Sequence, residues 1–170
     1  MTAHALDGDI NAQTEGAESI DDIAARISER ARARGVRIAC AESLTSGTVA
    51  SALGRAAEAA QWFRGGLVAY GEYAKVALLG VTPGPTVSER CATEMAMGVC
   101  ERLAADVVVS ITGVGGPGPT EGKPPGTVII ATCSARHSAV QTYHLPGDPA
   151  DVVAASTRLA LVMLREALDR

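Results

Sequence analysis

The 170-residue chain has few charges and no long hydrophobic run, and each of these two shortages excludes a class of protein. The net charge of −4 comes without a lysine or arginine cluster that would attract a nucleic acid backbone. No apolar run reaches the roughly 18 residues of a membrane span, and the N-terminus lacks the charged-then-apolar pattern of a signal peptide. We therefore expect a cytoplasmic protein that binds neither nucleic acid nor a membrane.

Cysteine and histidine are also sparse, and their spacing fits neither a metal site nor a disulfide framework. The three histidines lack the spacing of metal ligands. The cysteines are scattered without a Cys-x-x-Cys pair, at Cys40, Cys91, Cys100 and Cys133. The sequence thus predicts reduced thiols, no metal and no cofactor.

Hydrophobic residues make up 47% of the chain, which is enough to bury the core of one domain. Residues 1–17 are polar and acidic and predict a disordered tail, whereas residues 18–170 predict a single domain. In this domain, segments with helical periodicity alternate with short apolar runs. They predict helices at 19–34, 46–59, 71–79, 88–103 and 149–168, and strands at 37–41, 67–70, 107–111, 127–133 and 139–145.

The arrangement of these elements predicts the fold class. The run at 107–111 is continuously apolar, which is typical of a central strand covered on both faces. The strands at 127–133 and 139–145 follow each other closely and predict an antiparallel hairpin. Strands alternating with helices and closed by a hairpin indicate an α/β protein, a three-layer α/β/α sandwich with a mixed, mainly parallel sheet.

Ser43 lies at the bend between the first predicted strand and the helix after it. Unpaired N–H groups converge at the start of a helix, so a hydroxyl there can cap the helix or attack a bound carbonyl. Serine and threonine are common caps. The local sequence leaves both interpretations open.

Tyr70 ends the second predicted strand, and Lys75 lies one helical turn into the next element. Lysines in such places usually extend into solvent, but Lys75 lies in a region of small and apolar residues. Burial would lower the pKa of this lysine toward the value that a general base needs. Ser43 and a buried Lys75 would then form a Ser–Lys dyad, although sequence spacing does not show that they meet.

The glycine-rich segment at 113–118 matches Gly-x-Gly-x-x-Gly and follows a predicted strand. A dinucleotide site is excluded, because Pro117 and Pro119 prevent a helix from starting there and the acidic residue expected about 20 positions later is missing. Two interpretations remain: a loop whose N–H groups approach an anion or carbonyl, and a plain connection.

Five ordered motifs together resemble one family. They are Ala41-Glu42-Ser43-x-Thr45-x-Gly47, Gly65-Gly66-x-Val68-x-Tyr70 followed by Lys75, Leu79-Gly80-Val81, Thr112-Gly113-x-Gly115-Gly116-Pro117, and Lys123-Pro124-x-Gly126-Thr127-Val128. The chain resembles the CinA C-terminal domain family, the bacterial nicotinamide-nucleotide amidohydrolases. The resemblance implies an α/β/α fold, a homo-oligomer, and metal-free hydrolysis of nicotinamide mononucleotide to nicotinate mononucleotide and ammonia in pyridine-nucleotide recycling.

The resemblance also implies roles for individual residues. Ser43 would be the nucleophile, Lys75 its base, and Tyr70 a hydroxyl that bridges or orients the pair. Thr112 and the Gly113 amide would lie near the oxyanion. The other substrate-binding positions that it implies are Glu42, Thr45, Ser46, Gly47, Gly115, Gly116, Lys123, Gly126 and Thr127.

This sequence departs from the family pattern at several positions. Leu44 and Ser46 stand where the family usually has cysteine and glycine, and Pro149 and Val153 stand where it often has arginine. Arginine is the natural bidentate ligand of a phosphate. The candidates to replace it are Lys123, Arg64 and Arg158. Two alternatives therefore stay open: the same chemistry on another small amide, and a non-catalytic nucleotide-binding paralogue.

Overall fold

The computed structural model describes residues 18–170, and the tail predicted for residues 1–17 lies outside them. The helices are α1 (Ile20–Arg34), α2 (Thr48–Arg55), α3 (Ala59–Trp62), α4 (Glu72–Leu79), α5 (Glu89–Leu103) and α6 (Pro149–Leu168). The strands are β1 (Ile38–Glu42), β2 (Phe63–Val68), β3 (Val107–Gly113), β4 (Thr127–Ser134) and β5 (Ser138–His144).

The five strands form one sheet in the order β2-β1-β3-β4-β5. β1 pairs in parallel with β2 and β3, while β4 is antiparallel to both β3 and β5. Only β4 therefore runs against the other strands, and the predicted mixed, mainly parallel sheet is confirmed. β3 is the central strand, as its apolar run predicted, and its residues from Val107 to Thr112 are all buried.

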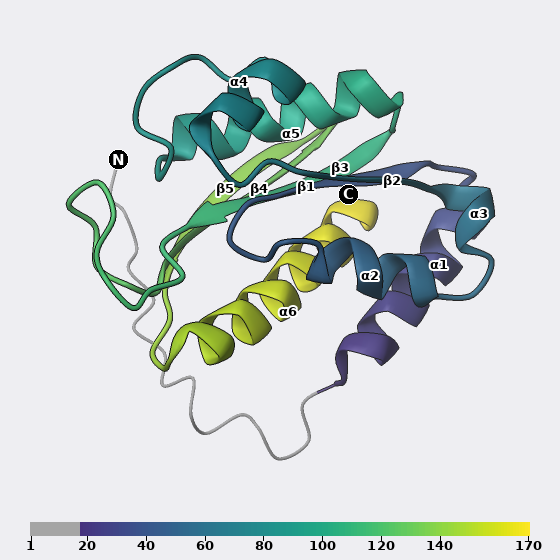
Figure 1. Cartoon of the computed structure of the whole chain (residues 1–170). Coiled ribbons are helices and arrows are strands. Elements are labelled where there is room, and N and C mark those ends of the chain that lie inside the picture. Colours follow the sequence, from purple (N-terminus) through teal and green to yellow (C-terminus); the bar gives the residue numbers. More distant parts are fainter. Residues whose placement is uncertain (1–17) are drawn as a thin grey trace.

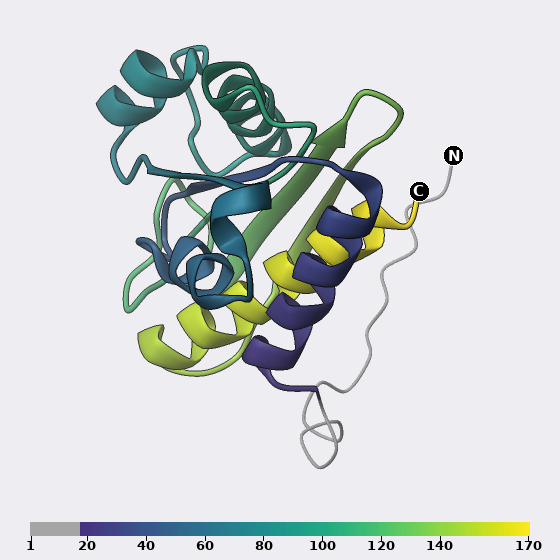
Figure 2. The same ribbon diagram turned by 90° about the vertical axis from the view of Figure 1, so that its right-hand side faces the viewer.

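Helices cover both faces of the sheet and complete the three-layer α/β/α sandwich (Figure 1). α4 and α5 lie on one face, and α1, α2, α3 and α6 lie on the other. The view in Figure 2 shows α1 and α6 side by side along the second face. Between residues 18 and 170, no helix combines the length and the apolar character needed to cross a bilayer.

Local sequence signals set the ends of the long helices. Ser19 caps α1 by accepting a hydrogen bond from the N–H of Asp22, and Gly35 ends the helix in the left-handed conformation. Asp148 caps α6 in the same way, with Pro149 as its first residue. These ends agree with the predicted ones because capping depends on residues within one turn of the helix.

The helix predicted at 46–59 is shorter in the structure, because α2 ends at Arg55. The carbonyl oxygen of Ala57 accepts hydrogen bonds from the hydroxyl of Ser28 and from the indole N–H of Trp62. Glu58 then adopts a left-handed conformation with φ 53° before the short helix α3. The contact with Ser28, 29 positions away, thus overrides a helical pattern that is made of small residues.

The second strand begins at Phe63 rather than at the predicted position 67, so it includes Gly65 and Gly66. The predicted strand at 67–70 left these two glycines outside it. A Cβ atom at Gly66 would lie 2.7 Å from the Cys40 sulfur and 2.9 Å from the Ala50 Cβ, which shows how closely α2 packs over this strand. Gly66 is therefore a packing glycine inside β2.

Candidate active site

The candidate site lies at the edge of the sheet where β2, β1 and β3 end. Ser43 follows β1, Tyr70 follows β2, and Thr112 and Gly113 end β3. Because parallel strands present their carboxyl ends at one edge, these residues meet although 70 positions separate Ser43 from Gly113. The first residues of α4 and α6 reach the same edge, since each helix follows a strand that runs in this direction.

The structure brings Ser43 and Lys75 together. The Nζ atom of Lys75 lies 2.9 Å from the Oγ atom of Ser43. It also donates to the carbonyl oxygens of Ala69 and Tyr70, each at 2.8 Å. Lys75 is only 1% exposed, so the alternative of a solvent-exposed lysine does not hold.

The three contacts of Lys75 suit both of its protonation states. A neutral amine has two N–H groups for the two carbonyls and a lone pair for the hydroxyl hydrogen of Ser43. A protonated amine has three N–H groups for the same three oxygens, and the Ser43 hydroxyl can then donate to the Tyr70 carbonyl, 3.3 Å away. A proton can therefore move between Ser43 and Lys75 without any displacement of the heavy atoms.

Burial lowers the pKa of Lys75, because the ammonium form loses its hydration. The sulfur of Cys91 on α5 and the carboxylate of Glu121 act in the opposite direction. Burial also raises the pKa of Cys91 to about 11, so this neighbour stays a neutral thiol near pH 7. Burial thus shifts the protonation equilibrium of Lys75 toward the neutral amine, which is the form that can accept a proton.

A cavity of about 250 Å³ opens beside this pair. Seven of the predicted site residues line it: Ser43, Tyr70, Lys75, Thr112, Gly113, Gly115 and Gly116. Sequence reasoning did not assign Thr86, Val87, Val114 and Thr120 to the site, and it noted Leu44, Pro149 and Val153 only as departures, yet these residues line the cavity as well. The cavity wall thus includes segments that precede α5 and begin α6.

The main-chain N–H of Gly113 faces the cavity side of β3. Val114, the next residue, donates its N–H to Thr127 on the β4 side. Successive N–H groups of an extended strand point in opposite directions, so that of Gly113 points toward β1. The pairing of β1 with β3 ends at Glu42 and Ile111, and the last bond of this pairing runs from the N–H of Ser43 to the carbonyl of Ile111. No residue of β1 therefore pairs with Gly113. A donor thus faces the space beside Ser43.

The main-chain oxygen of Tyr70 orients the pair, which corrects the role predicted for its hydroxyl. Lys75 and Ser43 both donate to the carbonyl oxygen of Tyr70. The side chain of Tyr70 lines the cavity but is 69% exposed, and its hydroxyl makes no hydrogen bond among residues 18–170. The hydroxyl therefore does not bridge Ser43 and Lys75.

Glu42 was predicted to bind substrate, but it lies under α2 and does not line the cavity. It is 0% exposed, and its carboxylate accepts hydrogen bonds from the N–H groups of Gly47 (2.9 Å), Val49 (3.1 Å) and Ala50 (2.8 Å). Glu42 therefore occupies the anion site that the N-terminus of α2 provides. The cap predicted as one alternative for Ser43 is supplied by Glu42.

Thr45, Ser46 and Gly47 also lie outside the cavity lining, so their contact with substrate stays a prediction. They form the turn that carries the chain from Ser43 into α2, with φ 49° at Ser46 and φ 104° at Gly47. Thr45 is buried, and its carbonyl oxygen accepts a hydrogen bond from the hydroxyl of Thr48. These residues shape the bend that exposes Ser43, and none of them lines the cavity.

Lys123, Gly126 and Thr127 were likewise predicted to bind substrate and lie outside the lining. The main chain of Lys123 pairs with that of Thr120, and the hydroxyl of Thr127 donates to the carbonyl of Pro124. A Cβ atom at Gly126 would lie 1.9 Å from the carbonyl oxygen of Leu145, so only glycine fits there. These three residues hold the glycine-rich loop in place.

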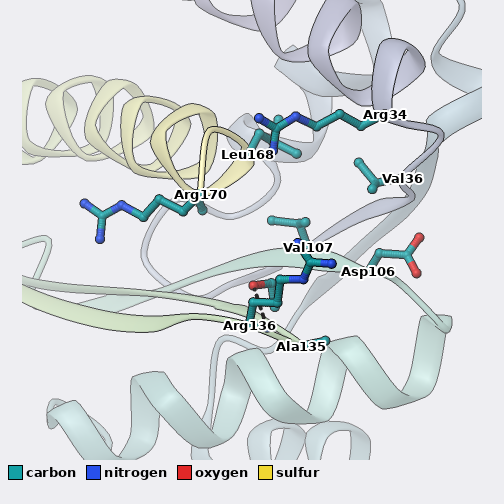
Figure 3. A pocket seen from close by; sticks show the side chains of 10 residues that line it. Arg34, Val36, Asp106, Val107, Ala135, Arg136, Leu168 and Arg170 are labelled. Carbon is teal, nitrogen blue, oxygen red and sulfur yellow. Dashed lines mark hydrogen bonds between the residues drawn. The ribbon is translucent and has the colours of Figure 1, made fainter.

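A second hollow, of about 360 Å³, lies at the opposite edge of the sheet (Figure 3). Arg34, Arg136 and Arg170 are among the residues that line it, and in Figure 3 the guanidinium group of Arg170 extends away from the other labelled side chains. Asp106, which also lines it, is paired with Arg37. The residues that line this hollow include no serine–lysine pair. The chemistry that we consider below therefore belongs to the cavity beside Ser43.

Comparison with known proteins gives one consistent result. The profile of the CinA C-terminal domain matches residues 20–168. A CinA-like protein of Mycolicibacterium paratuberculosis is 40% identical over 167 residues, which cover 91% of this chain and 37% of that protein. Protein YdeJ of Escherichia coli is 36% identical over 157 residues, which cover 89% of this chain and 91% of YdeJ. The chain thus spans about a third of the length of its mycobacterial relatives.

Solved structures show the same likeness. A competence-damaged protein (CinA) superfamily protein from Escherichia coli superposes with a TM-score of 0.84 at 36% identity, covering 87% of this chain and 90% of that one. The competence damage-inducible protein A from Klebsiella pneumoniae superposes with a TM-score of 0.87 at 32% identity, covering 90% and 99% of the two chains. The predicted resemblance is confirmed for the fold.

Proposed function

The chain belongs to the CinA C-terminal domain family, and we propose that it is an amidohydrolase in which Ser43 and Lys75 hydrolyse the carboxamide of nicotinamide mononucleotide. One observation carries this proposal: a buried Lys75 amine lies 2.9 Å from the Ser43 hydroxyl at the wall of a cavity. Lysines are almost never fully buried unless they are paired, yet the partners of Lys75 are a hydroxyl and two carbonyls rather than a carboxylate.

In the first half of the reaction, neutral Lys75 takes the hydroxyl proton as the Ser43 oxygen attacks the amide carbon. The carbonyl oxygen becomes an oxyanion, and the N–H of Gly113 faces the space in which it would form. The tetrahedral intermediate collapses, and protonated Lys75 returns its proton to the leaving nitrogen. Ammonia departs, and the acyl group stays on Ser43 as an ester.

The second half repeats these steps with water. Neutral Lys75 takes a proton from the water as its oxygen attacks the ester carbon, and the Ser43 oxygen leaves with the proton that Lys75 returns. The products are a carboxylic acid, which ionises near pH 7, and free Ser43. Atoms balance as amide plus water giving acid plus ammonia, and Lys75 ends the cycle neutral.

The α6 wall of the cavity favours a second candidate, the same chemistry on an amide without a phosphate. Pro149 and Val153 give this wall an apolar surface. None of the three cations expected to compensate, Arg64, Lys123 and Arg158, lines the cavity. The N–H groups at the start of α6 are also taken, since Asp148 accepts from Ala150 and Asp151. Within residues 18–170, the lining therefore offers a phosphate no cation besides Lys75.

The deciding experiment measures ammonia release from nicotinamide mononucleotide and, in parallel, from nicotinamide riboside. Wild type is compared with Ser43→Ala and Lys75→Met. Release from the mononucleotide that both variants abolish supports the first proposal, and release from the riboside alone supports the second. A ligand that raises the Tm of wild type and Ser43→Ala equally, without turnover, would instead indicate a nucleotide-binding paralogue. The homo-oligomer and the cytoplasmic location both stay predictions. Sedimentation of the purified chain tests the oligomeric state.

A further inference from the structure

Glu121 makes contacts beside the cavity that the reaction above does not use. It lies in the loop at residues 114–126 between β3 and β4, which contains most of the glycine-rich segment and which we call the glycine-rich loop. One carboxylate oxygen accepts from the N–H of Thr86 at 2.8 Å and from its hydroxyl at 2.7 Å, and the other accepts from the N–H of Val87 at 3.0 Å. Thr86 and Val87 line the cavity on the side of α5.

Three carboxylates hold residues 82–88, which form most of the connection between α4 and α5. Glu94 on α5 accepts from the N–H of Thr82 at 2.8 Å, and Glu72 on α4 accepts from the N–H of Gly84 at 3.1 Å. Both of these belong to the helices that flank the segment. Glu121 alone reaches it from the loop on the other side of the cavity.

The polar groups of Thr86 are all engaged. Its N–H and hydroxyl donate to Glu121, and its carbonyl accepts from the hydroxyl of Thr112 on β3 at 2.8 Å. Thr86 is therefore held in one position and has no main-chain group left for a substrate. Its contribution to the cavity is the placement of the wall.

We propose that Glu121 is a positioning residue that joins the glycine-rich loop to residues 82–88 and so fixes the place of the cavity wall formed by Thr86 and Val87. This inference rests on the proposed function, because it assigns Glu121 a part in placing the substrate amide. The carboxylate also adds a negative charge near Lys75, which no other residue of the loop supplies.

The charge of Glu121 also affects the pKa of Lys75, which gives a second quantity to measure. Burial would raise the pKa of Glu121, but the hydrogen bonds from Val87 and Thr86 and the charge of Lys75 outweigh it and lower that pKa. Lys75 in turn faces the hydroxyl of Ser43, the thiol of Cys91 on α5 and the carboxylate of Glu121. Removing the Glu121 charge should therefore lower the pKa of Lys75 further.

The test compares Glu121→Gln, Glu121→Asp and the matched control Glu94→Gln, which alters a carboxylate that holds the same segment from α5. Amide hydrogen exchange of Thr86 and Val87 and the pH profile of kcat/KM are measured for each. We expect exchange at these two amides to accelerate at least about tenfold in both Glu121 variants, and KM to rise roughly tenfold. The acid limb of the profile should move to lower pH in Glu121→Gln and stay in place in Glu121→Asp.

Other results would overturn the inference. A lower Tm in Glu121→Gln with unchanged KM and an unchanged acid limb would reduce Glu121 to a stabilising contact. Equal effects in Glu94→Gln would show that any anchor of residues 82–88 serves as well. If wild type hydrolyses no amide, the proposed function fails, and exchange then decides: unaltered exchange at Thr86 and Val87 in Glu121→Gln refutes the join between loop and segment.

Discussion

Replacing Glu42 with glutamine tests whether this carboxylate stabilises the fold or contacts substrate. The structure gives Glu42 three main-chain donors at the start of α2, with one carboxylate oxygen accepting from Gly47 and Val49 and the other from Ala50. Glutamine has the same shape but only one acceptor oxygen. Its carbonyl can keep the first two bonds, and its amide N–H₂ group then faces the N–H of Ala50.

The expected loss of stability follows from these contacts. Leaving the N–H of Ala50 without an acceptor costs about 1–3 kcal/mol. Removing a buried negative charge from a helix N-terminus costs up to about 2 kcal/mol. Glutamine recovers part of this, because a neutral group is less costly to bury. We expect the free energy of unfolding to fall by roughly 3 kcal/mol, which lowers Tm by about 6–12 °C for a domain of this size.

Urea denaturation followed by circular dichroism measures this change, and Asp148→Asn is the matched control. Asp148 caps α6 with two hydrogen bonds from N–H groups, but it lies at the surface. Its replacement should cost about 1 kcal/mol or less. An unchanged urea midpoint in Glu42→Gln, together with a raised KM for the amide substrate, would show that Glu42 contacts substrate and would refute the assignment made here.

Three further predictions follow from the structure. Lys75→Met should lower hydrolysis at least about a thousandfold. Between the lowered pKa of native Lys75 and its ordinary value of 10.5, the unfolded wild type binds more protons, so wild-type stability measured by Tm should rise with pH relative to the variant. Val153→Arg should lower KM for a phosphorylated amide about tenfold, with KM for the riboside unchanged as the control. Ala104→Gly should raise the free energy of unfolding by about 1 kcal/mol, because Ala104 ends α5 at φ 48°, and Gly35→Ala, at φ 62°, should lower it similarly. The same dependence of Tm on pH in wild type and Lys75→Met would refute the first prediction. Equal KM changes for the phosphorylated amide and the riboside in Val153→Arg would refute the second, and an unchanged urea midpoint in Ala104→Gly would refute the third.

Much of the fold could be predicted because its signals are local. The cap at Ser19, the glycine after α1 and the Pro149 start of α6 each act within one helical turn, so the sequence alone marks these ends. The continuous apolar run at β3 indicates a strand covered on both faces wherever it occurs. The bounds of α2 and β2 could not be found this way, since they depend on the contacts of Ala57 and Gly66 with distant residues.

The candidate site divides in the same manner. The sequence by itself determined which residues carry reactive groups, and that Ser43 stands at a bend between a strand and a helix. Only the tertiary structure decided which of them meet: parallel pairing of β1 with β2 places Lys75 against Ser43. Successive side chains along an extended strand point to opposite sides, so Glu42, the last residue of β1, lies beneath α2 while Ser43 faces the cavity. Proximity along the chain therefore could not show which side chains share the site, because the direction of each side chain depends on the packing of the whole sheet.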